Sequence, residues 1–185
     1  MDHLETVIHL NNAINQEIVK KIISLIDKKT TEKLTTVGGL NTSQRNVKGY
    51  NLKMGQNKMK PTDIFYGNII KSEIERLFVF YRAKFPLVKT NKIDQIDLLK
   101  YTSGGHYIPH VDYATGSTRY MSVIINLNND YEGGDLIFTD QKEKEIKRLK
   151  LDTGSIVFFP SNFMYPHSIQ PVTKGTRYSI VAWLQ

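Results

Sequence analysis

The sequence contains no cysteine, which excludes disulfide bonds and thiolate ligands for a metal ion. Any bound metal ion would therefore be held by histidine, carboxylate or water. Such ligands suit Fe(II) or a harder ion better than the closed cage of a structural zinc site.

Long apolar runs are also missing, and none in the sequence is long enough to span a bilayer. The first residues, MDHLETVIHL, lack the basic and apolar regions of a secretory signal peptide. We therefore expect no membrane association and no export, with the cytoplasm as the default location.

The formal charge of the chain is +7 at pH 7. Its lysines are scattered, so a solvated surface explains this charge as well as an acidic or nucleic-acid partner does. A function on nucleic acid stays open on this one feature. The 185 residues, 40% of them hydrophobic, fit a single globular domain.

Two helices are expected in the first half of the chain. Asn15 is a suitable N-cap for a helix whose apolar positions include Ile22 and Ile26. A second helix should begin near Pro61, with a buried stripe formed by Ile70, Ile74, Leu77, Phe78 and Tyr81. The polar residues 30–61 between them are expected to be loop, with a short strand around residues 50–54.

From residue 93 onward, short β-type segments alternate with turn residues. There are eight of them: IDLLKY, HYIPHVD, TRYMSVIINL, DLIFTD, EIKRLK, GSIVFFP, PHSIQPV and TRYSIVAWL. Helices followed by strands predict an α+β fold, an antiparallel sandwich or jelly roll with the helices outside one sheet. We assign residues 1–185 to one domain, with helical support and substrate loops in 1–92 and the jelly-roll core in 93–185.

The segment HYIPHVD carries a candidate metal site. Side chains two apart on a strand point the same way, so His110 and Asp112 could reach one ion. A His-x-Asp pair is common by chance, but His167 follows downstream in YPHSIQPV. Two histidines and one carboxylate form the facial triad of non-haem Fe(II) oxygenases, which leaves three coordination positions open. We expect His106 to be a loop or entrance residue, because Pro109 should distort the strand.

Arg177 is the second candidate feature. On its strand it shares one face with Ser179, Val181 and Trp183, which predicts a buried guanidinium. A buried arginine needs a partner, and its planar fork matches a carboxylate. A cosubstrate that brings its own carboxylate would meet this need.

These residues resemble the Fe(II)/2-oxoglutarate dioxygenases, in particular the prolyl 4-hydroxylase-like group with the PKHD-type hydroxylases. The resemblance covers residues 96–185, about half of the chain. Its motifs are LLKYTSGGHYIPHVD, INLNNDYEGGDLIF, GSIVFFPS and PHSIQPVTKGTRYSIVAWLQ, and they occur in the family's order.

The resemblance implies a double-stranded β-helix and a role for each matching residue. His110, Asp112 and His167 would bind Fe(II), and Arg177 would hold the C5 carboxylate of 2-oxoglutarate with help from Tyr101. Asn126 stands where some prolyl hydroxylases carry a tyrosine, so Asn126 or Ser179 would replace that tyrosine at the carboxylate. The matching apolar pocket positions are Ile124, Leu136, Ile169 and Trp183. Arg119 and Tyr107 are weaker candidates for substrate contacts.

The resemblance further implies hydroxylation of a C–H bond with O2 as oxidant and with succinate and CO2 as coproducts. A protein or peptide substrate, most readily a peptidyl proline, fits best, with ascorbate as the reductant. Two alternatives stay open: a 2-oxoglutarate oxygenase that acts on nucleic acid, and a non-catalytic jelly-roll binding module. The substrate's identity and the oligomeric state cannot be inferred from these residues.

Overall fold

The computed structural model describes residues 3–29, 32–34, 39–52, 60–90, 92–113 and 118–185. Its helical elements are the 3-10 turn η1 (His3–Thr6) and the helices α1 (Gln16–Lys28) and α2 (Pro61–Lys84). The strands before residue 92 are β1 (Ile8–Leu10), β2 (Glu32–Lys33), β3 (Arg45–Asn46) and β4 (Lys48–Asn51). The later strands are β5 (Ile93–Tyr101), β6 (His106–His110), β7 (Met121–Asn126), β8 (Glu132–Gly133), β9 (Leu136–Thr139), β10 (Glu145–Leu149), β11 (Ser155–Pro160), β12 (His167–Ile169), β13 (Val172–Lys174) and β14 (Arg177–Leu184).

Helix α1 begins as the sequence predicts. The side chain of Asn15 accepts a hydrogen bond of 2.8 Å from the backbone N–H of Glu17, which satisfies one of the free donors of the first turn. Its buried face consists of Val19, Ile22, Leu25 and Ile26. This face packs toward a sheet, so the helical spacing of the apolar residues is confirmed.

Helix α2 is a long helix that starts at Pro61, where the missing N–H costs nothing. All five predicted stripe residues are buried, and Gly67 and Asp63 are buried with them. Near the start of this helix the Asp63 carboxylate accepts hydrogen bonds from Lys29 Nζ (2.7 Å) and Tyr50 Oη (2.6 Å). These contacts join the end of α1, strand β4 and the start of α2. Within the described residues, no helix is long and apolar enough to cross a membrane.

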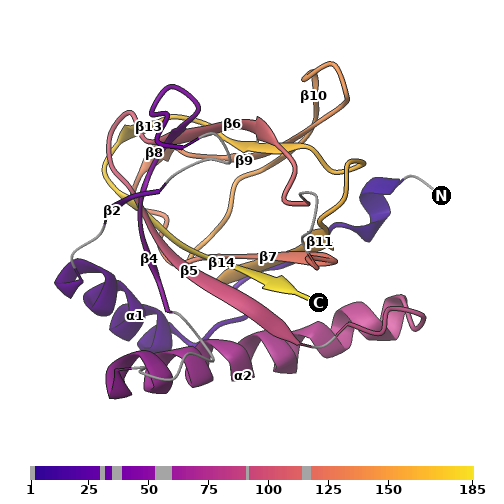
Figure 1. Cartoon of the computed structure of the whole chain (residues 1–185), viewed down its shortest axis with the longest axis horizontal. Helices are drawn as coiled ribbons and strands as arrows, with labels where there is room; N and C mark the ends of the chain where they lie inside the picture. The colour runs from indigo at the N-terminus through magenta and orange to yellow at the C-terminus, as the bar shows by residue number, and fades with distance from the viewer. Residues whose placement is uncertain (1–2, 30–31, 35–38, 53–59, 91, 114–117) are drawn as a thin grey trace.

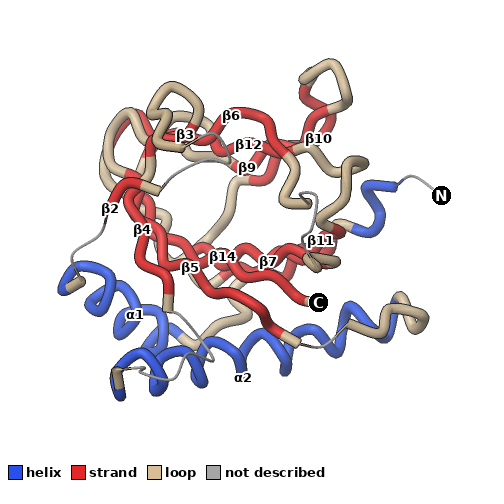
Figure 2. The backbone as a smooth tube through the Cα atoms, in the orientation of Figure 1, coloured by secondary structure: helices blue, strands red, loops and turns tan. Residues whose placement is uncertain are grey.

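The strands form two facing antiparallel sheets (Figures 1 and 2). The seven-stranded sheet has the order β1-β11-β7-β14-β5-β4-β2, and the five-stranded sheet has the order β10-β9-β12-β6-β3. Figure 1 shows α1 and α2 covering the outer side of the seven-stranded sheet, while the five-stranded sheet lies across its other side. The fold is therefore the predicted α+β jelly roll, a double-stranded β-helix with supporting helices.

The predicted strands need two refinements. PHSIQPV divides into β12 and β13, and β13 pairs with the short strand β8 as a separate two-stranded ribbon. The first 92 residues supply strands as well as helices, because β1, β2 and β4 extend one sheet and β3 extends the other. The expected strand near residue 50 is β4, while residues 53–54 lie outside the described residues. The assignment of the whole chain to one domain stays a prediction.

Two apolar clusters lie on opposite faces of the seven-stranded sheet. The first joins both helices to the outer face and includes Ile22, Ile74 and Phe78. The second lies between the sheets and includes Tyr101 and Phe138. Strand β14 contributes to both because its side chains alternate, so it can face the helices and the interior at once.

Candidate metal centre and carboxylate pocket

The predicted metal ligands converge because β6 and β12 are paired. His110 ends β6, His167 begins β12, and the two lie directly opposite each other in the antiparallel register. Asp112 follows two residues after His110, just beyond the strand. His110 Nε2 lies 3.6 Å from Asp112 Oδ1, and His167 Nε2 lies 3.7 Å from Asp112 Oδ2. One ligand atom from each residue falls within 4.8 Å of the others, so the three can hold one metal ion.

A bulge in β6 shapes this site. His167 pairs with His110 and Ile169 with Tyr107, so β6 has one more residue than β12 between these two pairs. The distortion expected from Pro109 is therefore present. It brings Tyr107 to the face of His110, where the two rings stack with centroids 3.5 Å apart. His106 begins β6 and so does not lie in a loop as expected; its ring nitrogens lie 2.9 Å from the Gly104 carbonyl and 3.0 Å from the Ser43 carbonyl, outside the His110, Asp112 and His167 cluster.

The two histidines are held in the tautomer that a metal requires. His110 Nδ1 lies 2.9 Å from the carbonyl of Ile108, and His167 Nδ1 lies 3.1 Å from the carbonyl of Tyr165. A carbonyl only accepts, so both Nδ1 atoms carry hydrogen and both Nε2 lone pairs face Asp112. Lone pairs and a carboxylate that converge without a proton between them repel one another. This donor set therefore fits a divalent cation such as Fe(II).

Burial sets the protonation of these groups. Desolvation, together with the neighbouring His110, lowers the pKa of His167 to about 4, so this ring is neutral at pH 7. Burial by itself would raise the pKa of Asp112. Positive charge on the two histidines when they are protonated, together with the hydrogen bond from Ser122, outweighs burial, so the pKa of Asp112 is lowered and the carboxylate is ionised.

Arg177 lies in the interior, 1% exposed, at the start of β14. Its Nη1 donates to Ser179 Oγ at 2.9 Å. Its Nε and Nη2 have no hydrogen-bond partner among the described residues. Buried N–H groups of a guanidinium are costly to leave unpaired, and a carboxylate would pair with both. The residues present therefore fit the distal carboxylate of 2-oxoglutarate.

The second glycine of the segment YEGGDL, Gly134, lies beside Arg177. Its φ is +68°, and a Cβ at this position would lie 3.0 Å from Arg177 Cδ and 2.9 Å from Tyr131 Cε2. Both the backbone conformation and the space favour glycine. The expected turn residue therefore also makes room for the arginine.

Metal ligands and arginine line one small cavity of about 30 Å³. Ten of the thirteen predicted site residues line it: Tyr101, Tyr107, His110, Asp112, Ile124, His167, Ile169, Arg177, Ser179 and Trp183. Tyr101 is buried beside the guanidinium, with its ring 5.2 Å from Arg177 Cζ, and burial raises its pKa so that the phenol keeps its proton.

The other three predicted residues do not line this cavity. Asn126 is fully buried, but its amide nitrogen donates to the carbonyls of Asn128 (2.6 Å) and Leu151 (2.9 Å). Its oxygen accepts from Tyr131 Oη at 3.2 Å. Asn126 therefore holds two loops together, whereas Ser179, the other candidate to replace the family tyrosine, contacts Arg177 directly. Leu136 belongs to the apolar cluster behind the cavity.

Arg119 is the third residue outside the cavity lining. Its guanidinium lies 3.7 Å from the centre of the Trp183 ring, a cation–π contact, and it donates to Gln95 Oε1 at 3.1 Å. Trp183 itself lines the cavity and is 5% exposed. Arg119 thus contacts a residue of the cavity wall without lining the cavity itself.

Three lining residues were not assigned to the site from the sequence: Arg45, Leu99 and Val181. Val181 shares the face of Arg177, so the strand alternation carried its signal. Arg45 comes from β3 in the first half of the chain, and its guanidinium lies 4.7 Å from the centre of the Tyr107 ring. Only the pairing of β3 with β6 brings it here.

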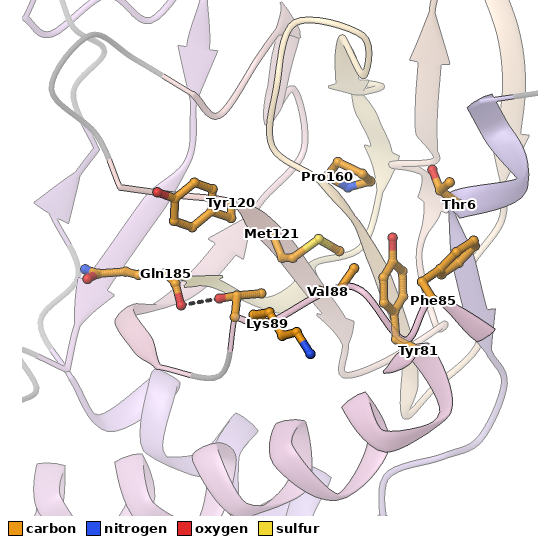
Figure 3. Close-up of a pocket in the computed structure, with 10 residues that line it drawn as sticks. Thr6, Tyr81, Phe85, Val88, Lys89, Tyr120, Met121, Pro160 and Gln185 are labelled. Atoms are coloured by element: carbon orange, nitrogen blue, oxygen red, sulfur yellow. Dashed lines mark hydrogen bonds between the residues drawn. The ribbon is translucent and has the colours of Figure 1, made fainter. Parts of the chain in front are cut away.

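A second and larger cavity of about 580 Å³ lies between the end of α2, the start of β7 and the end of β11 (Figure 3). Its walls are mostly apolar, with Tyr81, Phe85, Val88, Met121 and Pro160 among them. Among the described residues, its lining contains no histidine and no side-chain carboxylate. The chemistry is therefore concentrated in the smaller cavity.

Two histidines and a carboxylate inside an antiparallel jelly roll, beside a buried guanidinium with two unpaired nitrogens among the described residues, fit a mononuclear non-haem metal site of the oxygenase type. Comparison with known proteins agrees. Residues 96–185 match the sequence model of the 2OG-Fe(II) oxygenase superfamily. This match covers 90 of the 185 residues, so the second half of the chain is similar to this superfamily of dioxygenases.

Relatives are named as hydroxylases. A PKHD-type hydroxylase from Idiomarina loihiensis is 22% identical over 97% of this chain and 77% of its own length. Another from Prochlorococcus marinus is 34% identical over 55% of this chain and 45% of its own length. The chain thus spans between about half and three quarters of the curated relatives that it matches.

Solved structures share the fold. A prolyl-4-hydroxylase from Pseudomonas putida superposes with a TM-score of 0.76 at 16% identity, covering 100% of this chain and 96% of the other. A prolyl hydroxylase from Trichoplax adhaerens, in complex with a peptide of hypoxia inducible factor, gives a TM-score of 0.77 at 17% identity, covering 99% and 86%.

Proposed function

We propose that the protein is an Fe(II)- and 2-oxoglutarate-dependent hydroxylase that acts on a proline of a protein or peptide. The observation that carries the cosubstrate assignment is the buried Arg177, whose Nε and Nη2 find no partner among the described residues. A jelly-roll module without catalysis would have no use for an ion-pairing group kept unpaired next to a metal site.

When Fe(II) and 2-oxoglutarate are bound, the metal activates dioxygen, and 2-oxoglutarate supplies electrons through its oxidative decarboxylation to succinate and CO2. The residues of this chain bind and orient. His110, Asp112 and His167 would hold the metal, and a set of three protein ligands leaves coordination positions for cosubstrate and dioxygen. The carbonyls of Ile108 and Tyr165 keep both imidazoles in register by accepting their Nδ1 hydrogens.

Arg177 sets the position of the cosubstrate. Ser179 accepts one guanidinium hydrogen and leaves the Nε and Nη2 edge for the distal carboxylate. The apolar side chains Ile124, Ile169 and Val181 line the same cavity and keep water out of it.

The choice of substrate rests on the relatives and on the aromatic lining. Relatives and structural neighbours are named PKHD-type hydroxylases or prolyl hydroxylases. In this chain Tyr107 and Trp183 line the cavity that holds the metal ligands. Their flat apolar rings suit contact with the saturated ring of a proline, and Arg119 stacks on Trp183 and so fixes its orientation.

Two measurements test the proposal. Purified protein with Fe(II) and 2-oxoglutarate, kept free of oxygen, should develop a visible charge-transfer band, and Arg177→Lys should weaken it. Proline-containing peptides should then gain one oxygen atom by mass spectrometry, with succinate formed in equal amount and ascorbate sustaining turnover. A band without peptide oxidation, together with oxidation of an oligonucleotide, would instead support an oxygenase that acts on nucleic acid. Absence of the band would contradict the proposal.

A further inference from the structure

The carboxylate of Asp112 has a close contact that the metal site itself does not explain. Ser122 Oγ donates to Asp112 Oδ2 at 2.6 Å, much shorter than the 3.6 and 3.7 Å that separate this carboxylate from the two histidines. Ser122 is fully buried on β7, a strand of the opposite sheet. The hydrogen bond therefore ties a residue of the β6 side to the seven-stranded sheet.

A second serine continues this contact. Ser161 Oγ lies 2.8 Å from Ser122 Oγ, and Ser161 is 1% exposed. The hydrogen of Ser122 points to the ionised carboxylate, which can only accept, so Ser161 donates to Ser122. Two hydroxyl groups in series then lead to Asp112 Oδ2. Each bond in such a chain polarises the next, which strengthens the hold on the carboxylate.

Both serines are themselves held in place. The backbone N–H of Ser161 donates to the carbonyl of Tyr120, and the carbonyl of Ser161 accepts from the N–H of Tyr113, the residue after Asp112. The neighbouring residues Met121 and Pro160 pack into the wall of the apolar cavity (Figure 3). The serine pair thus fixes both the side chain of Asp112 and the backbone that follows it.

We propose that Ser122, oriented by Ser161, is a positioning residue that keeps Asp112 a one-oxygen ligand. The hydrogen bond draws charge from Oδ2 and fixes the carboxylate plane, so Oδ1 is the better donor to a metal. A carboxylate that coordinated through both oxygens would take one of the positions that cosubstrate and dioxygen need. The inference rests on the proposed function only in assuming that the triad binds a metal.

Metal binding tests the inference without turnover. Co(II), added to protein kept free of 2-oxoglutarate and oxygen, reports affinity by competition with a chelator and geometry by its visible d–d band. Removal of an outer-shell partner typically lowers metal affinity about 10- to 100-fold, which is the loss expected for Ser122→Ala. Ser161→Ala should give a smaller loss, about threefold to tenfold, since it acts through Ser122.

Two further variants separate positioning from general stability. Ser122→Thr keeps the hydroxyl, so affinity and the d–d band should return toward those of the wild type. Ser155→Ala is the matched control, because Ser155 is a fully buried, hydrogen-bonded serine at the other end of β11, and its loss should change neither. Thermal unfolding of each metal-free variant checks that it folds. If Ser122→Ala does not fold, the Co(II) affinity of Ser161→Ala tests the positioning role instead.

The outcomes are distinct. If Ser122→Ala binds Co(II) as tightly as the wild type with an unchanged d–d band, the positioning role is wrong. If only Ser122→Ala weakens binding, the part assigned to Ser161 is wrong. If the wild type binds no Co(II), the metal site of the proposed function fails as well.

Discussion

The two faces of strand β14 differ in what they contact. Ile180, Ala182 and Leu184 face the helices and belong to an apolar cluster without charged members. Arg177, Ser179 and Trp183 face the interior between the sheets and line the cavity of the metal ligands. One strand thus divides stability and chemistry between its two sides, since alternate side chains point in opposite directions.

The two cavities show the same division. The larger one is about 580 Å³ and apolar, while the metal site opens into only about 30 Å³. Volume alone would therefore direct attention to the wrong place. Convergent polar groups, unpaired N–H atoms and a histidine whose pKa is lowered mark the functional side instead.

The largest effect should come from a metal ligand on the interior side. His167→Ala removes one of three ligands, and succinate formation should fall at least about a thousandfold. Circular dichroism of the metal-free variant shows whether it is folded. Turnover near that of the wild type would mean that the interior face does not carry the chemistry.

A substitution in the cluster between the helices and the sheet should lower stability and leave the activity of the folded protein nearly unchanged. Ile74 is 0% exposed in the helix–sheet cluster, so Ile74→Ala should lower the free energy of unfolding by about 3 kcal/mol. Urea unfolding measures this, and succinate formation per folded molecule should stay within about twofold of the wild type. Val79→Ala, on the exposed side of the same helix, is the control with an expected change below about 0.5 kcal/mol.

The buried ion pair beneath the helices should contribute next. Asp63→Asn removes the partner of Lys29, and the free energy of unfolding at pH 7 should fall by about 2 kcal/mol. Burial opposes ionisation of Asp63, but the hydrogen bonds from Lys29 and Tyr50 prevail and its pKa is lowered from 3.8. The stabilisation is therefore present above pH 3.8 and is lost as the pH falls through the lowered pKa.

Urea unfolding of wild type and Asp63→Asn at neutral and at strongly acid pH checks this dependence. The difference between them should shrink in acid. Asp27→Asn is the control, because the Asp27–Lys100 pair is more exposed and should contribute under about 1 kcal/mol. An equal loss of unfolding free energy in Asp63→Asn and Asp27→Asn would show that the buried pair contributes no more than the exposed one.

The smallest effect should separate the two parts of the interior site. Arg177→Lys keeps the charge but loses the planar fork, so KM for 2-oxoglutarate should rise about tenfold. Affinity for Co(II), titrated alone, should stay within about twofold, because the arginine is not a ligand. Arg76→Lys, on the exposed surface of α2, should change neither. Equal losses of metal and cosubstrate affinity would show that the two parts are not independent.

Much of the fold could be predicted because the local signals agree with one another. The cap at Asn15, the proline at the start of α2 and the apolar stripes all act within a few residues. The shared direction of His110 and Asp112 and the interior face of Arg177 could also be predicted, because side chains alternate along a strand. The hydrogen bonds of Asn126 could not be predicted in this way, because its amide donates both to the carbonyl of Asn128, two residues on, and to that of Leu151, which is distant in the sequence.

By itself the sequence determined the two helices, most of the strands, the absence of cysteine ligands and the candidate residues for the metal and the carboxylate. Only the tertiary structure decided that a bulge turns Tyr107 onto His110, that Arg45 arrives through β3, and that Ser161 and Ser122 hold Asp112. The reason is physical: periodicity specifies which way a side chain points along its own strand. Register between strands specifies what it meets, and register is settled by packing over the whole molecule.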